Sequence, residues 1–283
     1  MSKTLPFSGL SALRALRALR GLCVSLLCVW AVATTAQAQT KPKRTDLGND
    51  AARVFLWVGN SFFYYNNSMH GHFGALAAAA DAKSGYRSVS LTISGSGLDW
   101  HDMESYLRPN GIGRYSFIAN NEIRFNGAGR QFDGVIMMDC SQCPIHPQLK
   151  PVFHAFVKKD AEIVVKNGAR PVLFMSWAYK DKPEMTAQLA EQYTVAGNAN
   201  DALVIPAGLA FARAIEGRPE LELYQADKRH PTLAGTYLAA CTTWAALSKK
   251  SPVGNSYTAG LAPELAAYLQ KAAWDAVQAY YAP

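Results

Sequence analysis

Two short motifs at opposite ends of the chain contain the residue types that activate a hydroxyl nucleophile. Ser61 closely follows the apolar run 54–58, and Asp227 and His230 lie three residues apart before a stretch with helical character. A serine hydroxyl becomes a strong nucleophile when a histidine accepts its proton and a carboxylate holds that histidine. The three residues therefore predict a serine hydrolase, provided that the fold brings the two motifs together.

The Gly-Asn-Ser sequence that contains Ser61 occurs twice, so the tripeptide by itself is a weak signal. The second copy ends at Ser256, lies between two expected helices and follows no apolar strand, which indicates a turn. The copy that ends at Ser61 follows a continuous apolar run bounded by glycine, which is typical of a strand covered on both faces. The strand context therefore favours Ser61 as the nucleophile.

Strand-like and helix-like segments alternate along the chain. We expect strands at 54–58, 88–93, 134–138, 171–175 and 202–205, and helices at 68–82, 150–167, 184–197, 207–216, 231–248 and 263–281. This alternation predicts an α/β fold with a mostly parallel sheet, right-handed crossovers and helices on both faces. The irregular segment 102–132 is expected to be an insertion that walls the active site.

The candidate residues all follow strands. Ser61 follows the first expected strand, Gly95 the second, the segment 139–142 the third, and the loop with Asp227 and His230 follows the last strand region. In a parallel sheet the carboxyl ends of the strands share one edge, and ligands bind beyond that edge. We therefore expect these segments to meet at a single site.

Two blocks of the chain resemble the SGNH/GDSL hydrolases, in particular an exported branch that opens with a Gly-Asn-Ser-Phe block. The first block is Gly59-Asn60-Ser61-Phe62-Phe63-Tyr64-Tyr65-Asn66, and the last is Asp227-x-x-His230-Pro231. The resemblance implies a three-layer α/β/α sandwich with a flavodoxin-like, five-stranded sheet. It also implies cleavage of acyl esters without a cofactor or a metal ion.

The resemblance assigns a role to each site residue. It implies that Ser61 is the nucleophile, that His230 is the general base and that Asp227 orients the imidazole. The oxyanion hole would consist of the amides of Ser61 and Gly95 and a side-chain amide from the third block. That block departs from the Gly-x-Asn-Asp pattern of the family, so either Gln142 or Ser141 would supply the third donor.

The spacing of Cys140 and Cys143 leaves several interpretations open. The pair could be structural thiols or a local disulfide, one of the two could pair with Cys241, or they could carry redox or metal chemistry. A thioredoxin-like pair should open a helix, whereas prolines follow here. A zinc site would need more ligands than His146, the one obvious neighbour.

The first 38 residues have the pattern of a signal peptide. An apolar core at 22–33 precedes the small-x-small sequence 36–38, and the basic residues before it are Lys3, Arg14, Arg17 and Arg20. We expect cleavage after Ala38, a periplasmic or secreted protein, and one hydrolase-like domain over 39–283. The apolar core is shorter than the roughly 20 residues that a membrane span needs, so we expect no stable membrane insertion of the mature chain.

The charge of the chain argues against nucleic-acid binding. The net charge of +7 comes from 28 Lys and Arg against 21 Asp and Glu, and removal of the four basic residues of the signal peptide leaves 24 against 21, or +3. No run of basic residues is interleaved with aromatic ones. We therefore expect no nucleic-acid partner, and the resemblance implies a small-molecule or glycan ester as the substrate.

The sequence thus predicts an exported esterase that acts on carbohydrate acetyl groups, short-chain esters or lipids. One alternative is an SGNH-fold module that binds glycans or the cell envelope and has weak or no activity, because the third block is altered. Another is a thiol-disulfide protein that uses Cys140 and Cys143. Several aromatic residues would either bury an apolar or sugar ring or pack in the core, namely Phe62, Phe63, Tyr64, Tyr65 and Trp100.

Overall fold

The computed structural model describes Met1 and residues 40–108, 111, 115–117, 119–125 and 129–283. The chain divides into two units, Met1–Ala38 and Gln39–Pro283, and the second unit contains all the named helices and strands. Apart from Met1, the expected signal peptide lies outside the described residues. Among the helices that are described, none combines the length and the apolar character needed to cross a membrane.

A parallel five-stranded sheet forms the centre of the second unit. Its strands are β1 (Val54–Gly59), β2 (Arg87–Thr92), β5 (Gly134–Met137), β6 (Arg170–Phe174) and β7 (Leu203–Ile205), and their order is β2-β1-β5-β6-β7. The predicted strands are therefore confirmed to within one or two residues. β1 lies between β2 and β5, so three strand ends that carry candidate residues are neighbours.

The apolar run in β1 is explained by its central position. Phe55, Leu56, Trp57 and Val58 are all at most 1% exposed, because helices cover both faces of the sheet. β2 lies at the edge and alternates polar with apolar residues, and its residues are mostly half-buried. The two sequence patterns thus match the two positions in the sheet.

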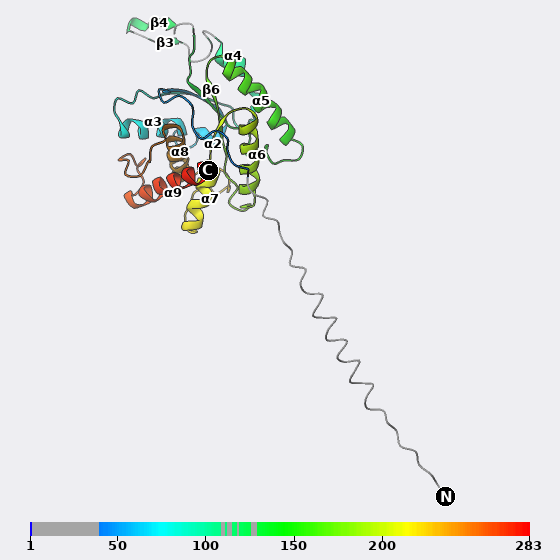
Figure 1. Cartoon of the computed structure of the whole chain (residues 1–283). Coiled ribbons are helices and arrows are strands. Elements are labelled where there is room, and N and C mark those ends of the chain that lie inside the picture. Colours follow the sequence, from blue (N-terminus) through cyan, green and yellow to red (C-terminus); the bar gives the residue numbers. More distant parts are fainter. Residues whose placement is uncertain (2–39, 109–110, 112–114, 118, 126–128) are drawn as a thin grey trace. The chain divides into compact units, whose positions relative to one another are not determined.

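Helices form a layer on each face of the sheet. The helices are α3 (Met69–Ala80), α5 (Lys150–Lys166), α6 (Met185–Ala199), α7 (Ala207–Gly217), α8 (Leu233–Ser248) and α9 (Pro263–Tyr281). α8 packs against α3, α7 and α9, while α5 and α6 pack against each other and against β6 (Figure 1). This is the predicted three-layer α/β/α sandwich.

Helix α8 is buried nearly all round, and its start sets the position of the last motif. Every residue from Ala234 to Ala246 is buried. The helix was expected to begin at residue 231 but begins at Leu233, because the Thr232 hydroxyl accepts a hydrogen bond from the N–H of Gly235 and caps it. The loop before this cap is consequently free to present Asp227 and His230 at the sheet edge.

The segment 102–132 contains small elements of its own. Its described parts include helix α4 (Met103–Leu107) and an antiparallel hairpin of β3 (Tyr115–Phe117) and β4 (Ile123–Phe125). The hairpin is separate from the parallel sheet and projects from the domain (Figure 1). The segment is an insertion as expected, and its role as a wall of the active site stays a prediction.

Candidate active site

The turn after β1 presents Ser61 at the start of the short helix α2 (Ser61–Tyr64). The residue before it, Asn60, caps this helix, since its side-chain oxygen accepts a hydrogen bond from the N–H of Phe62 at 3.2 Å. The Asn60 amide also donates to the carbonyls of Ser96 (2.9 Å) and Asp139 (3.2 Å). One buried side chain therefore ties together the loops that follow β1, β2 and β5.

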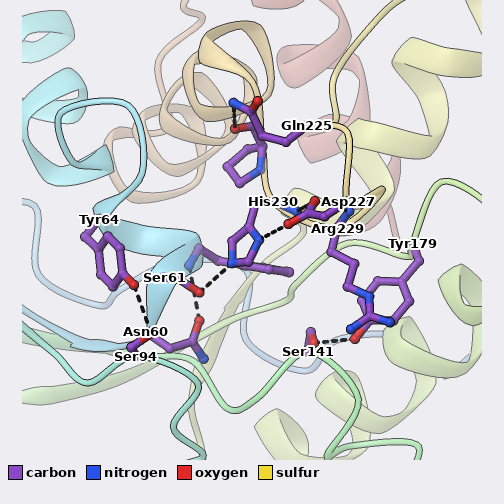
Figure 2. Close-up of polar contacts among 12 residues, drawn as sticks. Asn60, Ser61, Tyr64, Ser94, Ser141, Tyr179, Gln225, Asp227, Arg229 and His230 are labelled. Atoms are coloured by element: carbon purple, nitrogen blue, oxygen red, sulfur yellow. Dashed lines mark hydrogen bonds and ion pairs between the residues drawn. The ribbon is translucent and has the colours of Figure 1, made fainter.

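Ser61, His230 and Asp227 form a continuous hydrogen-bonded triad (Figure 2). The distance from Ser61 Oγ to His230 Nε2 is 2.8 Å. On the other side of the ring, His230 Nδ1 is in direct hydrogen-bond contact with Asp227 Oδ2. Residues that are 169 positions apart in the chain thus meet in the order that general-base activation of a serine requires.

Asp227 is held as a carboxylate by hydrogen bonds. Its Oδ1 accepts the backbone N–H groups of Arg229 and His230, each at 3.0 Å. Partial burial would raise the pKa of Asp227, but the hydrogen bonds from the His230 ring and from these two N–H groups lower the pKa to about 2. The residue that faces the imidazole is therefore an acceptor at neutral pH, as an orienting carboxylate must be.

Further contacts fix the loop around the triad. The N–H of Gln225 donates to the carbonyl of His230 at 2.8 Å, and Trp177 Nε1 donates to the carbonyl of Arg229 at 2.9 Å. Tyr224 and Pro231 form an isolated antiparallel bridge. These bonds place His230 by its backbone as well as by its ring.

Aromatic rings surround His230. The Tyr65 ring stacks on the imidazole, with centroids 4.3 Å apart and planes 11° apart, and Phe62 meets it edge-on at 5.5 Å. Phe62 in turn stacks on Trp177 at 4.6 Å. Tyr65 and Phe62 therefore support the imidazole from two directions.

The five aromatic residues singled out in the sequence separate into two groups. Phe62 and Phe63 are 4% and 1% exposed and belong to the core. Tyr64 and Trp100 are 38% and 60% exposed, and Tyr65 is half-buried against His230. Tyr64 bonds Ser94 at 3.0 Å beside the site (Figure 2). Only the second group has ring surface available to a ligand.

Gly95 lies in a turn that its lack of a side chain permits. The N–H of Ser96 donates to the carbonyl of Ile93, and Gly95 has a φ of +73°, which is the conformation that glycine favours at the third position of a type II turn. Within the described part of the chain, the backbone N–H groups of Gly95 and Ser61 have no hydrogen-bond acceptor. Both predicted amide donors are therefore available to a ligand.

The loop after β5 distinguishes the two candidates for the third donor. The hydroxyl of Ser141 is hydrogen-bonded to that of Tyr179 at 2.7 Å (Figure 2). The side chain of Gln142 makes no hydrogen bond within the described residues and is half-buried. Gln142 is thus the residue whose side-chain donor is uncommitted.

Cys140 and Cys143 are joined in a disulfide, which is one of the interpretations that the sequence left open and which excludes the alternative of a disulfide with Cys241. The four-residue turn brings the two Cα atoms within 5.2 Å, whereas Cys241 is a free thiol buried in α8. Asp139 lies within 4.8 Å of both disulfide sulfurs. Sulfurs that are bonded to each other supply no thiolate ligands, so we assign no metal site there.

Asp139 and Asp160 are buried carboxyl groups, and burial raises the pKa of both. Asp139 Oδ1 accepts the N–H groups of Leu98 (3.3 Å) and Cys140, and burial raises the pKa of Asp139 to about 6 despite these bonds. Asp160 in α5 is 1% exposed, and neither of its oxygens has a hydrogen-bond partner in the part of the chain that is described. Burial raises the pKa of Asp160 to about 7.

Asn60, Asp139 and Tyr65 are site residues whose roles were not predicted from the sequence. Asn60 belongs to the Gly-Asn-Ser motif, so its capping and bridging function had a signal in the type of residue that precedes the serine. Asp139 directly follows a predicted strand. Nothing in the linear sequence indicated that Tyr65 stacks on a histidine from the other end of the chain.

Comparison with known proteins supports the fold. No family model matches the chain, and no curated protein matches it. Solved structures do match. A DUF4886 family protein from Bacteroides uniformis ATCC 8492 is 18% identical, with a TM-score of 0.53 over 80% of this chain and 94% of that one.

Two further solved structures match the chain over most of its length. The acetylxylan esterase Axe2 from Geobacillus stearothermophilus, solved as a catalytic mutant, is 15% identical, with a TM-score of 0.51 over 69% of this chain and 93% of that one. A GDSL-like lipase candidate from Parabacteroides merdae ATCC 43184 is 12% identical, with a TM-score of 0.52 over 74% of this chain and 99% of that one. The chain therefore has the fold of the SGNH/GDSL hydrolases.

Proposed function

We propose that this protein is an exported serine hydrolase that cleaves acyl esters. The observation that carries the proposal is the contact of 2.8 Å between Ser61 Oγ and His230 Nε2, continued from His230 Nδ1 to Asp227. A serine, an imidazole and a carboxylate in this order are the groups that activate a hydroxyl for attack on a carbonyl.

In the proposed reaction, Ser61 Oγ attacks the ester carbonyl while His230 Nε2 takes its proton. Asp227 holds Nδ1–H and stabilises the imidazolium that forms. The imidazolium then gives its proton to the leaving alcohol, and an acyl group remains on Ser61. Water, activated by His230, attacks this acyl-enzyme, and the acid is released together with free Ser61.

The tetrahedral oxyanion would be bound at the N-terminal edge of α2. The uncommitted amides of Ser61 and Gly95 supply two donors, and the side chain of Gln142 supplies the third in place of the family's asparagine. Ser141 is the less suitable candidate because its hydroxyl is engaged by Tyr179. Loss of one such donor commonly reduces kcat by about 10²–10³.

The substrate class that we propose is a short acyl ester, with carbohydrate acetyl groups first. The exposed rings of Tyr64 and Trp100 offer flat apolar surface of the kind on which a sugar ring can pack. The side chains of His230 and Asp227 are 24% and 44% exposed while Ser61 is 7% exposed, so the triad opens toward solvent on the side of His230 and Asp227. An open triad favours a short acyl chain over a long lipid chain, which would need an enclosed apolar pocket.

Labelling with a fluorophosphonate probe tests the activated serine. The purified wild-type protein should be labelled, Ser61→Ala should not be labelled, and His230→Ala should be labelled far more slowly. Ser256→Ala is the matched control, because Ser256 ends the second Gly-Asn-Ser sequence and is exposed. It should be labelled like the wild type.

The same experiment decides between the enzyme and the alternative module. A folded wild-type protein that is never labelled would exclude a working triad and would favour a glycan-binding or envelope protein with weak or no activity. Labelling that persists in Ser61→Ala would place the reactive nucleophile elsewhere. A panel of acetylated sugars and of 4-nitrophenyl esters with increasing chain length would then sort the substrate classes.

Export is the remaining part of the proposal. The basic, apolar and small-x-small pattern of the first 38 residues supports it. The described fold begins at Thr40, whose N–H and hydroxyl both bond the carboxylate of Glu191, so the domain is anchored directly after the expected cleavage site. N-terminal sequencing of the protein recovered outside the cytoplasm should read from Gln39, and an intact Met1 would contradict cleavage.

A further inference from the structure

One cation beside the triad has no anionic partner among the described residues, and its position is fixed. Arg229 directly precedes His230 in the chain. Its N–H donates to Asp227 Oδ1 at 3.0 Å and its carbonyl accepts from Trp177 Nε1 at 2.9 Å, so the backbone is held on both sides. The side chain therefore starts from a defined point next to the proposed general base.

The guanidinium of Arg229 lies over the ring of Tyr179, 4.8 Å from its centroid (Figure 2). Tyr179 is only 5% exposed, and its hydroxyl is bonded to Ser141 at 2.7 Å. The charge is thus held over the ring of Tyr179, whose hydroxyl bonds the residue that precedes Gln142. A cation that is placed in advance by stacking loses less conformational freedom when it binds a ligand.

Two neighbouring cations, Lys228 and Lys180, differ from Arg229 because they are paired. Lys228 contacts Asp181 at 3.2 Å, and Lys180 contacts Glu222 at 2.8 Å. Within the described part of the chain, Arg229 has no carboxylate within ion-pair distance. Asp227 is the acid closest in sequence, and its oxygens are occupied by His230 and by two backbone N–H groups.

We propose that Arg229 binds a carboxylate on the substrate, so that the enzyme prefers acyl esters that carry a negative charge near the scissile bond. A guanidinium presents its N–H donors in a fork that matches the two oxygens of a carboxylate. The ligand would be an ester of an acidic molecule, for example one with a uronic acid or dicarboxylic acid component. This inference rests on the proposed ester hydrolysis.

Matched pairs of charged and neutral esters test the inference. For charge in the acyl part, the probes are mono(4-nitrophenyl) glutarate and its methyl ester. For charge in the alcohol part, they are 4-acetoxybenzoate and its methyl ester. The quantity measured is the ratio of kcat/KM for the charged probe to kcat/KM for the neutral one, which removes any common effect on folding or on the triad.

In the wild type, this ratio should favour the charged member of at least one pair by about fivefold, as expected for one exposed charged contact. Arg229→Gln should reduce that ratio to about one, and Arg229→Lys should give an intermediate value. Lys180→Gln is the control, because it removes a nearby cation that is already paired. It should keep the wild-type ratio.

Three results would overturn the inference or its basis. Hydrolysis of the neutral probes with no preference for the charged ones would overturn the role of Arg229 and leave the proposed function intact. If Lys180→Gln lowers the preference as much as Arg229→Gln does, the preference comes from the general positive potential of this surface and not from a binding site at Arg229. Hydrolysis of no probe, together with no fluorophosphonate labelling, would overturn the proposed function as well.

Discussion

Replacement of Tyr65 by leucine should slow catalysis, because the Tyr65 ring lies flat on the imidazole of His230. The ring centroids are 4.3 Å apart and the planes differ by 11°. In the proposed mechanism, this imidazole is neutral in the free enzyme and positively charged in the transition state. An aromatic face attracts a cation more strongly than a neutral ring, so the contact stabilises the transition state more than the ground state.

The stacked geometry of Tyr65 on His230 sets the size of the expected loss in kcat. A stacked cation–π contact at a partly buried site contributes about 1–2 kcal/mol. Since each 1.36 kcal/mol is about tenfold in rate, kcat should fall by about 5-fold to 30-fold in Tyr65→Leu, with little change in KM. Steady-state kinetics on a short 4-nitrophenyl ester would measure both constants.

Two variants serve as controls for this prediction. Tyr65→Phe keeps the stacked ring and should retain kcat within about twofold, which separates stacking from any role of the hydroxyl. Tyr64→Leu removes the adjacent ring, which is 38% exposed and stacks on Tyr65 but makes no ring contact with His230 in the described structure. Because Tyr64 belongs to the proposed substrate surface, this variant should change KM and leave kcat within about twofold. An unchanged kcat in Tyr65→Leu, or an equal loss in Tyr65→Phe, would refute the reasoning.

The triad carboxylate, a buried acid and the disulfide give three further predictions. Asp227→Asn should reduce kcat by about 10³–10⁴, because an amide in place of the carboxylate no longer selects the tautomer of His230 that accepts a proton at Nε2; near wild-type turnover would contradict this. Asp160 keeps its proton to a higher pH in the folded protein than in the unfolded chain, so its contribution to stability should be complete below about pH 4 and fall by up to about 4 kcal/mol as the pH rises through 7. Denaturant unfolding at several pH values should show that Asp160→Asn loses less free energy of unfolding with rising pH than the wild type does. Identical pH dependence in both proteins would show that Asp160 is not the cause of the loss. Replacement of Cys140 and Cys143 by serine should lower the free energy of unfolding by about 2 kcal/mol, as expected for a short closed loop, and should reduce kcat by loosening the loop that holds Gln142; unchanged stability measured by urea unfolding would contradict it.

The order and type of the main elements could be predicted from the sequence because their signals are local. A continuous apolar run bounded by glycine, such as 54–58, is typical of a strand that is covered on both faces, and 88–93 alternates as an edge strand does. The right-handed crossover rule then places successive parallel strands with few alternatives. Helix limits are harder to predict, since the start of α8 depends on a cap from Thr232.

The contacts that complete the site could not be predicted in this way. The link from Asn60 to the carbonyls of Ser96 and Asp139 joins three loops whose relative positions arise only when the strands pair. The choice between a local disulfide and one with Cys241 also depended on the fold, because α8 buries Cys241 away from the edge. The linear sequence gives the type and position of each residue, but it gives no distance between remote segments.

The sequence by itself determined the alternation of strands and helices and the candidate residues Ser61, Asp227 and His230, because residue type and local periodicity are properties of short segments. The tertiary structure alone decided that Ser61 Oγ lies 2.8 Å from His230, that Tyr65 stacks on the same ring, and that Arg229 stays without an acidic partner in the described part of the chain. These are contacts between segments far apart in the chain. Their distances are set by the packing of the whole core, and a linear sequence does not state them.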